Sequence, residues 1–223
     1  YNINTKTLIF LILSGIATGA SWLCYFKALQ IGDVNKVTPI DKSSTILTML
    51  MAFIFLGEEI TFIKGISMIL IGIGTYLMII KKKNVTVENK SNAWLIYALG
   101  SAIFASLTSI LGKVGIENID STLGTAIRTI VVLIMAWIVV FVTKKQNTIR
   151  EIDKNSWIFL FLSGIATGGS WLCYYRALQM GPASVVVPID KLSILVTIVF
   201  SYIVFKEKLN KKSALGLLLI VIG

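Results

Sequence analysis

Residues 14–42 read SGIATGASWLCYFKALQIGDVNKVTPIDK, and residues 163–191 read SGIATGGSWLCYYRALQMGPASVVVPIDK. The match continues without a gap, so that residues 14–74 align with residues 163–223 at an offset of 149, with 28 identities in 61 positions. Unrelated segments of this length would share only a few identities. The chain therefore contains an internal repeat, and the interpretation of every other feature starts from it.

The composition is that of a membrane protein. Hydrophobic residues make up 56% of the 223 positions and charged residues only 14%, with a mean hydropathy of +0.83. A soluble domain carries roughly 25% charged residues, so this chain cannot cover a globular surface in water. Soluble enzymes, disordered tails and nucleic-acid-binding modules are thereby excluded. The net charge of +10 falls in short loops between apolar runs, where it fits a membrane surface.

Apolar runs bounded by charged residues predict eight membrane-spanning helices. A run of about 20 residues crosses a bilayer as a helix, and the runs lack the strict alternation of a membrane β-strand. The predicted spans are residues 7–26, 34–56, 61–80, 92–112, 123–143, 156–175, 183–205 and 212–223. The expected fold class is therefore an all-α membrane protein, a polytopic helical bundle in contact with the lipid bilayer.

The two copies of the repeat are predicted to cross the membrane in opposite directions. They pair the first span with the sixth, the second with the seventh and the third with the eighth, and five steps reverse the direction. Such inverted-topology repeats are typical of secondary transporters, whose binding site lies between the copies near the bilayer midplane. Each copy is then five helices long, which implies a ten-span parent with eight spans visible.

This repeat predicts the domain organisation. We expect residues 1–80 to hold the last three helices of the N-terminal copy, with its first two helices missing. Residues 81–91 form a cytoplasmic linker, and residues 92–223 form the C-terminal five-helix copy with a truncated last helix. Gly15-x-x-x-Gly19 and its counterpart Gly164-x-x-x-Gly168 are predicted to be helix contact faces, because small residues let membrane helices approach closely.

The basic residues predict the orientation. Of the 21 lysines and arginines, 14 fall on one side of the predicted topology, four on the other, and three inside spans. Cytoplasmic loops carry such an excess. The loops 81–91, 144–155 and 206–212 are therefore predicted to be cytoplasmic, in the inner membrane of a prokaryotic cell.

Two Asp-Lys pairs in the repeated P-I-D-K motif are the main candidate site residues. Lys42 lies roughly 12 Å into its span, where a charge costs about 2.5–3.5 kcal/mol on insertion scales, so such residues are candidates for a substrate or ion pathway. Neighbouring helix positions lie about 100° apart, so partners are expected elsewhere. Asp41 would pair with Lys191 and Asp190 with Lys42, or the acids would pair with Arg128 and its unseen repeat equivalent. A permanent structural ion network is the alternative interpretation.

Prolines lie two residues before each aspartate, at Pro39 and Pro188. A proline removes a backbone donor and frees the carbonyl one turn earlier, so each helix is expected to break or flex beside its charges. Arg128 lies about one turn inside its own span. Its side chain either snorkels to the interface or anchors Asp190 or an anionic group of the substrate.

An aromatic pair is repeated on the helix before each P-I-D-K motif, Trp22 with Tyr25 and Trp171 with Tyr174. Residues three apart share a helix face. Each pair therefore either packs against neighbouring helices or lines a cavity, where it could hold an amine by cation–π contact.

The sequence carries no catalytic or metal-binding pattern. It has no histidine, no second carboxylate within a turn of Asp41 or Asp190, and no nucleotide-binding loop, and its two cysteines lie inside apolar runs. Enzyme activity, a metal site and a cofactor are therefore not expected. Any driving force comes from a proton or ion gradient, unless the protein is a facilitator.

Several motifs resemble the EamA family of the drug/metabolite transporter superfamily. They are the A-L-Q-x-G ending of one span, the proline inside the next, Leu56-Gly57-Glu58 at its end, and the glycine-studded closing span. Leu111-Gly112-Lys113, Ala126-Ile127-Arg128-Thr129 and Pro188-Ile189-Asp190-Lys191 resemble the short five-span members. The second copy departs from the family pattern at Lys206, where glycine is usual. The resemblance implies ten helices in two inverted units, a central cavity, and export or exchange of small metabolites.

The expected function is therefore secondary transport of small metabolites by alternating access, as an exporter or exchanger of amino-acid-like or amine solutes. A non-transporting membrane scaffold and an intramembrane enzyme are the alternatives. The expected partners are the lipid bilayer and a small-molecule substrate, with no nucleic acid, and the protein is expected to be a monomer or homodimer.

Overall fold

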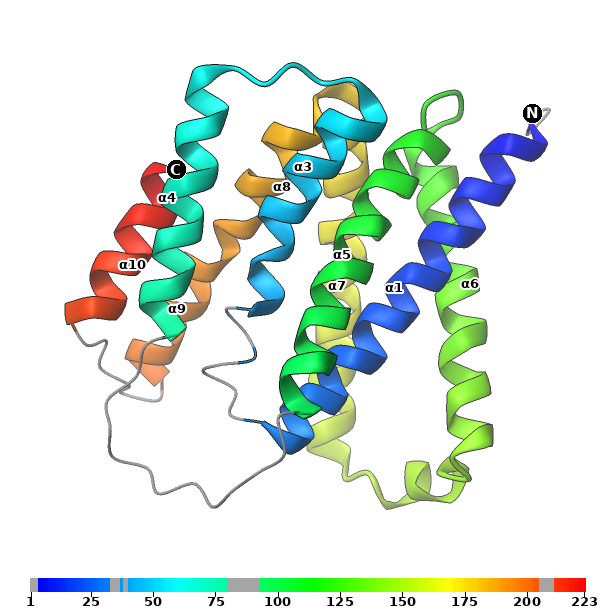
Figure 1. The fold of residues 1–223 in the computed structure, drawn as a ribbon. Coiled ribbons are helices and arrows are strands. Elements are labelled where there is room, and N and C mark those ends of the chain that lie inside the picture. Colours follow the sequence, from blue (N-terminus) through cyan, green and yellow to red (C-terminus); the bar gives the residue numbers. More distant parts are fainter. Residues whose placement is uncertain (1–3, 33–36, 38–39, 80–92, 205–210) are drawn as a thin grey trace. The chain divides into compact units, whose positions relative to one another are not determined.

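The computed structural model describes residues 4–32, 37, 40–79, 93–204 and 211–223, and the elements in these residues are all helical (Figure 1). The all-α prediction is confirmed for this part of the chain. The helices are α1 (Thr5–Ile31), α3 (Ser44–Leu56), α4 (Phe62–Ile79), α5 (Ala93–Gly115), α6 (Ser121–Val142), the 3₁₀ helix η1 (Gln146–Glu151), α7 (Lys154–Met180), α8 (Ala183–Lys191), α9 (Ser193–Val204) and α10 (Lys211–Ile222).

Described helices overlap every predicted span. They differ from the prediction at their ends, and the predicted span 183–205 is divided into α8 and α9. α1 and α7 both run for 27 residues and continue past the predicted ends until the chain reaches Gly32 and Gly181. Among the described residues, five segments are long and apolar enough to cross a membrane, and Phe62–Leu77 is a shorter apolar helix. The five segments are Thr5–Ile31, Ala93–Gly115, Ser121–Val142, Lys154–Met180 and Ala183–Phe200. The full count of eight crossings stays a prediction.

An aspartate side chain begins α6. The Asp120 carboxylate accepts hydrogen bonds from the backbone N–H groups of Thr122, at 2.8 Å, and Leu123, at 3.3 Å. Such a cap satisfies donors that have no partner inside the helix. Hydrogen bonds from the side chain and backbone of Thr122 hold the pKa of the Asp120 carboxyl below its ordinary value. Asp153 begins α7 in the same way.

The first of two compact units comprises residues 1–19 and 111–181, which include the start of α1, the end of α5, and α6, η1 and α7. Here α1 lies against α6. A Cβ added at Gly15 would lie 2.8 Å from Val131 Cβ, and one added at Gly19 would lie 2.9 Å from Met135 Sδ. These two glycines therefore form a close helix contact, as predicted, because a larger side chain would collide there.

The corresponding glycines on α7 make no such contact. A Cβ added at Gly164 or Gly168 would meet no atom within 4 Å in the described part of the chain. The expectation that both glycine pairs serve as contact faces is therefore wrong for α7 in this structure. The reason is that α6 packs on Gly15 and Gly19 of α1, whereas no described helix packs on Gly164 and Gly168 of α7.

The second unit comprises residues 20–110 and 182–223, which include the end of α1, α3, α4, most of α5, and α8 to α10. In this unit α4 packs against α10, and α3 packs against α8 and α4. Figure 1 shows α4 and α10 side by side and antiparallel. Its core combines alanines such as Ala28, Ala52 and Ala98 with larger apolar side chains such as Met49 and Val187, and the alanines let membrane helices approach closely.

The contact between α4 and α10 is reciprocal. A Cβ added at Gly74 would lie 2.6 Å from the carbonyl oxygen of Gly216, and one added at Gly223 would lie 2.9 Å from the carbonyl oxygen of Ser67. In the repeat, Gly74 corresponds to Gly223 and Ser67 to Gly216. The two helices therefore contact each other through corresponding positions of the repeat. This is the pattern of a self-complementary contact with two-fold symmetry.

Candidate functional site

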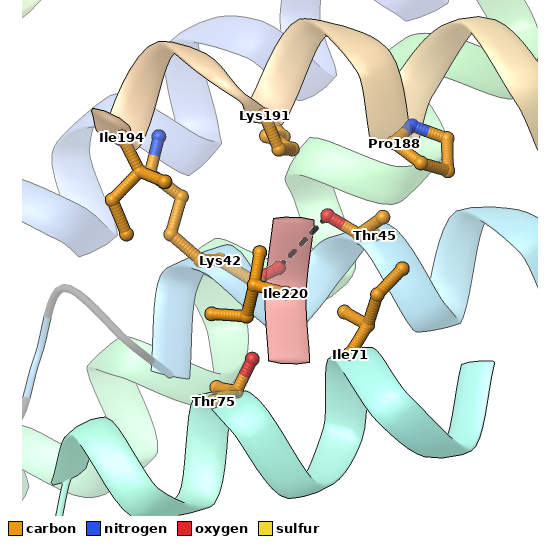
Figure 2. A pocket seen from close by; sticks show the side chains of 8 residues that line it. All are labelled: Lys42, Thr45, Ile71, Thr75, Pro188, Lys191, Ile194 and Ile220. Carbon is orange, nitrogen blue, oxygen red and sulfur yellow. Dashed lines mark hydrogen bonds between the residues drawn. The ribbon is translucent and has the colours of Figure 1, made fainter. Parts of the chain in front are cut away.

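A small cavity lies inside the second unit, beside the P-I-D-K motif of α8 (Figure 2). Its volume is about 20 Å³, which is room for about one water molecule. Its lining residues are Lys42, Thr45, Ile71, Thr75, Pro188, Lys191, Ile194 and Ile220. The lining is mostly apolar, with the two lysines as its charged members.

The lining is made of corresponding residues from the two copies of the repeat. Lys42 and Lys191, Thr45 and Ile194, and Ile71 and Ile220 each differ by 149 in residue number. Three such pairs around one cavity place it where the two copies meet inside this unit. A site of this kind presents similar side chains from both copies.

The cavity lies beside an interruption in each copy. α8 ends at Lys191 and α9 begins at Ser193, with a tight hydrogen bond from the Leu192 N–H to the carbonyl of Ile189, 3.0 Å. In the first copy the equivalent turn is at Ser43, between the helical residues 40–42 and α3. Pro188 lies within α8, four residues before the turn. Pro39 lies outside the described residues.

Asp190 is paired with its own neighbour. Lys191 Nζ lies 3.7 Å from Asp190 Oδ2, and their side chains are 26% and 36% exposed. The expected cross-repeat pairs, Asp41 with Lys191 and Asp190 with Lys42, do not form within 4.0 Å in this structure. The sequence argument considered only the rotation of about 100° between adjacent helix positions. The flexible four-carbon chain of a lysine is long enough to reach the carboxylate of the preceding residue.

Asp41 is held by a serine hydroxyl group. Its Oδ1 accepts a hydrogen bond of 2.6 Å from Ser101 Oγ on α5, and Ser101 Oγ lies 3.3 Å from Ser21 Oγ on α1. Bonds from a hydroxyl to a carboxylate are short and strong because the acceptor is charged. Ser101 was not predicted as a site residue, although polar side chains in membrane helices usually face other helices.

Lys42 has no carboxylate within 4.0 Å among the described residues. Lys42 and Lys191 nevertheless line the same cavity, and Asp41 and Asp190 directly precede them in the chain. The four charges of the two motifs therefore belong to one electrostatic cluster. Within it, Asp190 and Lys191 form the direct ion pair, while the neighbouring Lys42 amine is left without one.

Glu58, in the Leu56-Gly57-Glu58 motif, holds the start of α8. Its carboxylate accepts hydrogen bonds from the backbone N–H groups of Ala183, at 2.6 Å, and Ser184, at 3.0 Å. A carboxylate at a helix N-terminus satisfies free donors and complements the helix dipole. Gly57 makes the turn possible, because its φ of 64° is unfavourable for residues with a side chain.

A second candidate cluster lies in the first unit, around Arg128 of α6. The Arg128 side chain is 0% exposed. Its Nε donates to Ser14 Oγ at 2.8 Å and its Nη2 donates to Thr18 Oγ1 at 2.7 Å, and both acceptors are on α1. Complete burial contradicts snorkelling to the interface. The alternative, that Arg128 anchors Asp190 or an anionic group of the substrate, stays a prediction.

Two aromatic rings of α7 lie against the same guanidinium. Its central carbon is 4.1 Å from the ring centroid of Tyr175 and 5.3 Å from that of Trp171. Both Trp171 and Tyr174 were predicted site residues. Trp171 contacts Arg128, but the second ring against the guanidinium is that of Tyr175 and not that of Tyr174. Tyr174 instead packs edge-on against the Tyr175 ring. The rotation of a helix about its axis, which decides this, depends on tertiary packing.

The aromatic pair of the first copy is not brought to either cluster. Trp22 is 41% exposed, and Tyr25 packs against a small core of Ala28, Val37 and Ala98. The packing interpretation therefore fits Tyr25 in this structure. Neither side chain lines the cavity of Figure 2.

The Leu111-Gly112-Lys113 motif has a structural role. A Cβ added at Gly112 would lie 2.7 Å from Tyr175 Cε1, so glycine is needed for the ring to lie where it does. Lys113 Nζ donates to the carbonyl oxygens of Leu178 and Gly181 at the end of α7, the latter at 2.6 Å. A cation there complements the negative end of the helix dipole.

Comparison with known proteins assigns the family. The model of the EamA-like transporter family matches residues 1–80 and 92–223. The chain belongs to the EamA-like transporter family. The resemblance found in the sequence motifs is thereby confirmed, and the chain is a multi-pass membrane protein of a transporter family.

Curated relatives carry transporter names. An "Uncharacterized transporter in cobO 3'region" of Sinorhizobium sp is 44% identical over 133 residues, which cover 60% of this EamA chain and 94% of that protein. The "Uncharacterized transporter YxxF" of Bacillus subtilis (strain 168) is 24% identical over 161 residues, 71% of this chain. The aligned part spans half of the length of YxxF.

A solved structure shares the fold. A chain described as "Crystal structure of protein" superposes with a TM-score of 0.70 over 97% of this EamA chain and 83% of its own, at 11% sequence identity. Identity this low supports the fold alone.

Proposed function

We propose that this EamA chain is a secondary transporter that moves small metabolites by alternating access between two inverted copies of one repeat. The observation that carries the proposal is that the corresponding lysines Lys42 and Lys191 line one cavity. In inverted-repeat transporters the substrate site lies where the copies meet, and rocking of one copy against the other exposes it to each side in turn.

The inversion is supported within the second unit. The repeat-related helices α4 and α10 are antiparallel and make the reciprocal contacts of Gly74 and Gly223. Because Gly74 lies beside Gly216, the end of α4 and the start of α10 lie at the same end of the pair. The basic segments 81–91 and 206–212 follow and precede these ends, although residues 80–92 and 205–210 lie outside the described residues. The two basic segments are therefore expected on the same side of the membrane, which fits their proposed cytoplasmic location.

The charge cluster supports a mechanism of partner exchange. Asp190 is bound to Lys191, Asp41 is bound to Ser101, and Lys42 lacks a carboxylate within 4.0 Å in the described residues. A buried charge left alone is costly, so each state of the transporter must offer every charge some partner. We propose that the acids exchange partners between the inward-open and outward-open states, or that a charged substrate or coupling ion takes one partner's place.

The proposed cargo is an amino-acid-like or amine solute, exported or exchanged across the inner membrane of a prokaryotic cell. A proton or ion gradient supplies the energy. The two copies are assigned to residues 1–80 and 92–223, and the functional protein to a monomer or homodimer.

Counterflow into proteoliposomes tests this function. Vesicles holding the full chain are loaded with unlabelled amino acids and placed in a ¹⁴C-labelled amino acid mixture, and a second set uses ¹⁴C-labelled amines. Label should accumulate in wild-type vesicles, and Lys42→Gln and Lys191→Gln should each reduce the rate at least about tenfold, whereas the exposed Lys211→Gln should not. Failure of both labelled sets in wild type, or full activity of both cavity variants, would refute the proposal.

A further inference from the structure

The Arg128 guanidinium is a fully buried cation with one free nitrogen. Ser14 and Thr18 use its Nε and Nη2, while Nη1 is buried with no hydrogen-bond partner in the described part of the chain. Buried polar groups are almost always hydrogen-bonded, so each exception calls for an explanation. A guanidinium also has a fork of donors that matches a carboxylate.

The unit around Arg128 offers it no opposite charge. Its four acidic residues are all exposed, and none forms an ion pair with Arg128. They are Glu117, Asp120, Glu151 and Asp153. The groups that do contact Arg128 are neutral hydroxyls and aromatic rings. An unpaired buried cation is unfavourable in a membrane protein, and such residues mark substrate or ion pathways.

The surroundings restrict how a ligand can reach this cation. The ring of Tyr175 covers one face of the guanidinium at 4.1 Å, and Ser14 and Thr18 occupy one edge. Nη1 is the nitrogen that has no hydrogen-bond partner among the described residues, so a ligand would bind to the edge that includes it. A planar carboxylate fits an arginine edge, because two parallel N–H···O bonds can form.

We infer that Arg128 is the anion-binding residue of this transporter and that its Nη1 edge receives the carboxylate of an amino-acid-like substrate. The inference rests on the proposed transport function and narrows its substrate class. The rings of Trp171 and Tyr175 already contact the Arg128 cation, so they are not assigned to an amine of the substrate. Binding to Arg128 requires a carboxylate on the substrate, and amines that lack a carboxylate should bind poorly.

Alternating access accounts for the burial of the site. Arg128 is 0% exposed, so the structure represents a closed arrangement of α1, α6 and α7 around the guanidinium. Entry of the ligand requires these helices to separate, and binding replaces the missing counter-charge. Ser14 and Thr18 act as positioning residues, because their hydroxyls fix the orientation of the fork.

A binding experiment with matched solutes tests the inference. The full chain in nanodiscs is unfolded thermally, with tryptophan fluorescence as the readout, in the presence of a mixture of free amino acids or of the same amino acids as carboxamides. The two mixtures share their amines and side chains and differ in the carboxylate. Free acids at ten times their dissociation constant should raise the melting temperature by about 3 °C or more, and carboxamides should leave it unchanged.

Variants then assign the effect to Arg128. Arg128→Gln should abolish the rise, and Arg128→Lys should reduce it, because lysine keeps the charge but lacks the fork. The control is Arg176→Gln, which changes an exposed arginine of α7 that bonds to Gln179, and it should respond like wild type. A carboxylate-dependent rise that persists in Arg128→Gln overturns the inference. If Arg128→Gln does not fold, the inference is tested by the wild-type protein, in which acids but not carboxamides should raise the melting temperature.

The two proposals can fail separately. Equal effects of acids and carboxamides on wild type, or no effect of either, overturn the anion site even when counterflow succeeds. Stabilisation by free acids alone, without any counterflow in proteoliposomes, leaves the anion site standing and refutes the transport function.

Discussion

Lys42 and Lys191 are 149 residues apart in the chain, occupy the same position in two copies of a repeat, and line one cavity of about 20 Å³. Two cations at one apolar cavity repel each other, and nearby acids or a bound anionic ligand must offset this repulsion. Asp190 is bound to one of them, at 3.7 Å, and Asp41 is bound to Ser101 instead. The arrangement is thus asymmetric in detail although its parts are symmetric in sequence, which fits the proposed exchange of ion partners between two states.

The exchange of ion partners predicts how the acids respond to neutralisation. Asp190→Asn removes a charge but keeps the size and hydrogen-bonding capacity of the side chain, so the protein should still fold and counterflow should fall at least about tenfold. Monodispersity in detergent and the counterflow rate are the two measurements. Ser101→Ala, which keeps the carboxyl group of Asp41 but removes its 2.6 Å hydrogen bond, should give a smaller loss. Full transport by the double variant Asp41→Asn, Asp190→Asn would end the exchange model.

The glycines of the repeat give a matched test of packing. Gly15→Ala places a Cβ 2.8 Å from Val131 Cβ, whereas Gly164→Ala places one in open space. Overpacking of this kind costs about 1–3 kcal/mol, so Gly15→Ala should lower the melting temperature and Gly164→Ala should not. Thermal unfolding in nanodiscs measures both. Equal destabilisation by the two variants would show that a further helix packs on α7.

Glu58 should stabilise the fold by holding the start of α8. Glu58→Ala leaves the N–H groups of Ala183 and Ser184 without their charged acceptor, and bonds to charged groups contribute about 1.5–3 kcal/mol. The neighbouring Glu59→Ala, at an exposed position, serves as control. Chemical unfolding of both variants is the check, and an unaltered midpoint for Glu58→Ala would contradict the assigned role.

The cap at Asp120 predicts a dependence of stability on pH. Because hydrogen bonds from Thr122 lower the pKa of the Asp120 carboxyl in the folded protein, its stabilising effect is complete above the unfolded pKa of about 3.9. The effect is lost as pH falls through the folded pKa. Asp120→Ala should therefore melt at a lower temperature than wild type at pH 7, and the difference should shrink below about pH 4. A difference that is constant from pH 7 to pH 3 would exclude the charged cap.

The orientation can be tested without a structure. A cysteine introduced at Asn84, in a background with Cys24→Ser and Cys173→Ser, should resist a membrane-impermeant maleimide added to intact cells and react after lysis. Asn84 lies outside the described residues, and the prediction rests on the excess of lysines in its loop. A cysteine at Asp33, in the loop on the same side of the predicted topology, should behave identically. Rapid labelling of intact cells at Asn84 would reverse the orientation.

The helical membrane fold could be predicted from the sequence because it depends on local and repeated properties. Long apolar runs must be helical in lipid, where each backbone group needs a partner within its own segment. The positions of the helices followed from the charges and glycines that bound these runs. The correspondence of Lys42 with Lys191 also followed from the repeat alone.

The partners of the site residues were decided by tertiary structure. Asp41 binds Ser101, a residue of another helix, and Arg128 contacts Tyr175 rather than Tyr174. The sequence shows which residues share a helix face, but it does not show which way that face turns. That rotation follows from close packing at sites such as Gly15 and Gly112, where only a missing side chain lets two helices meet.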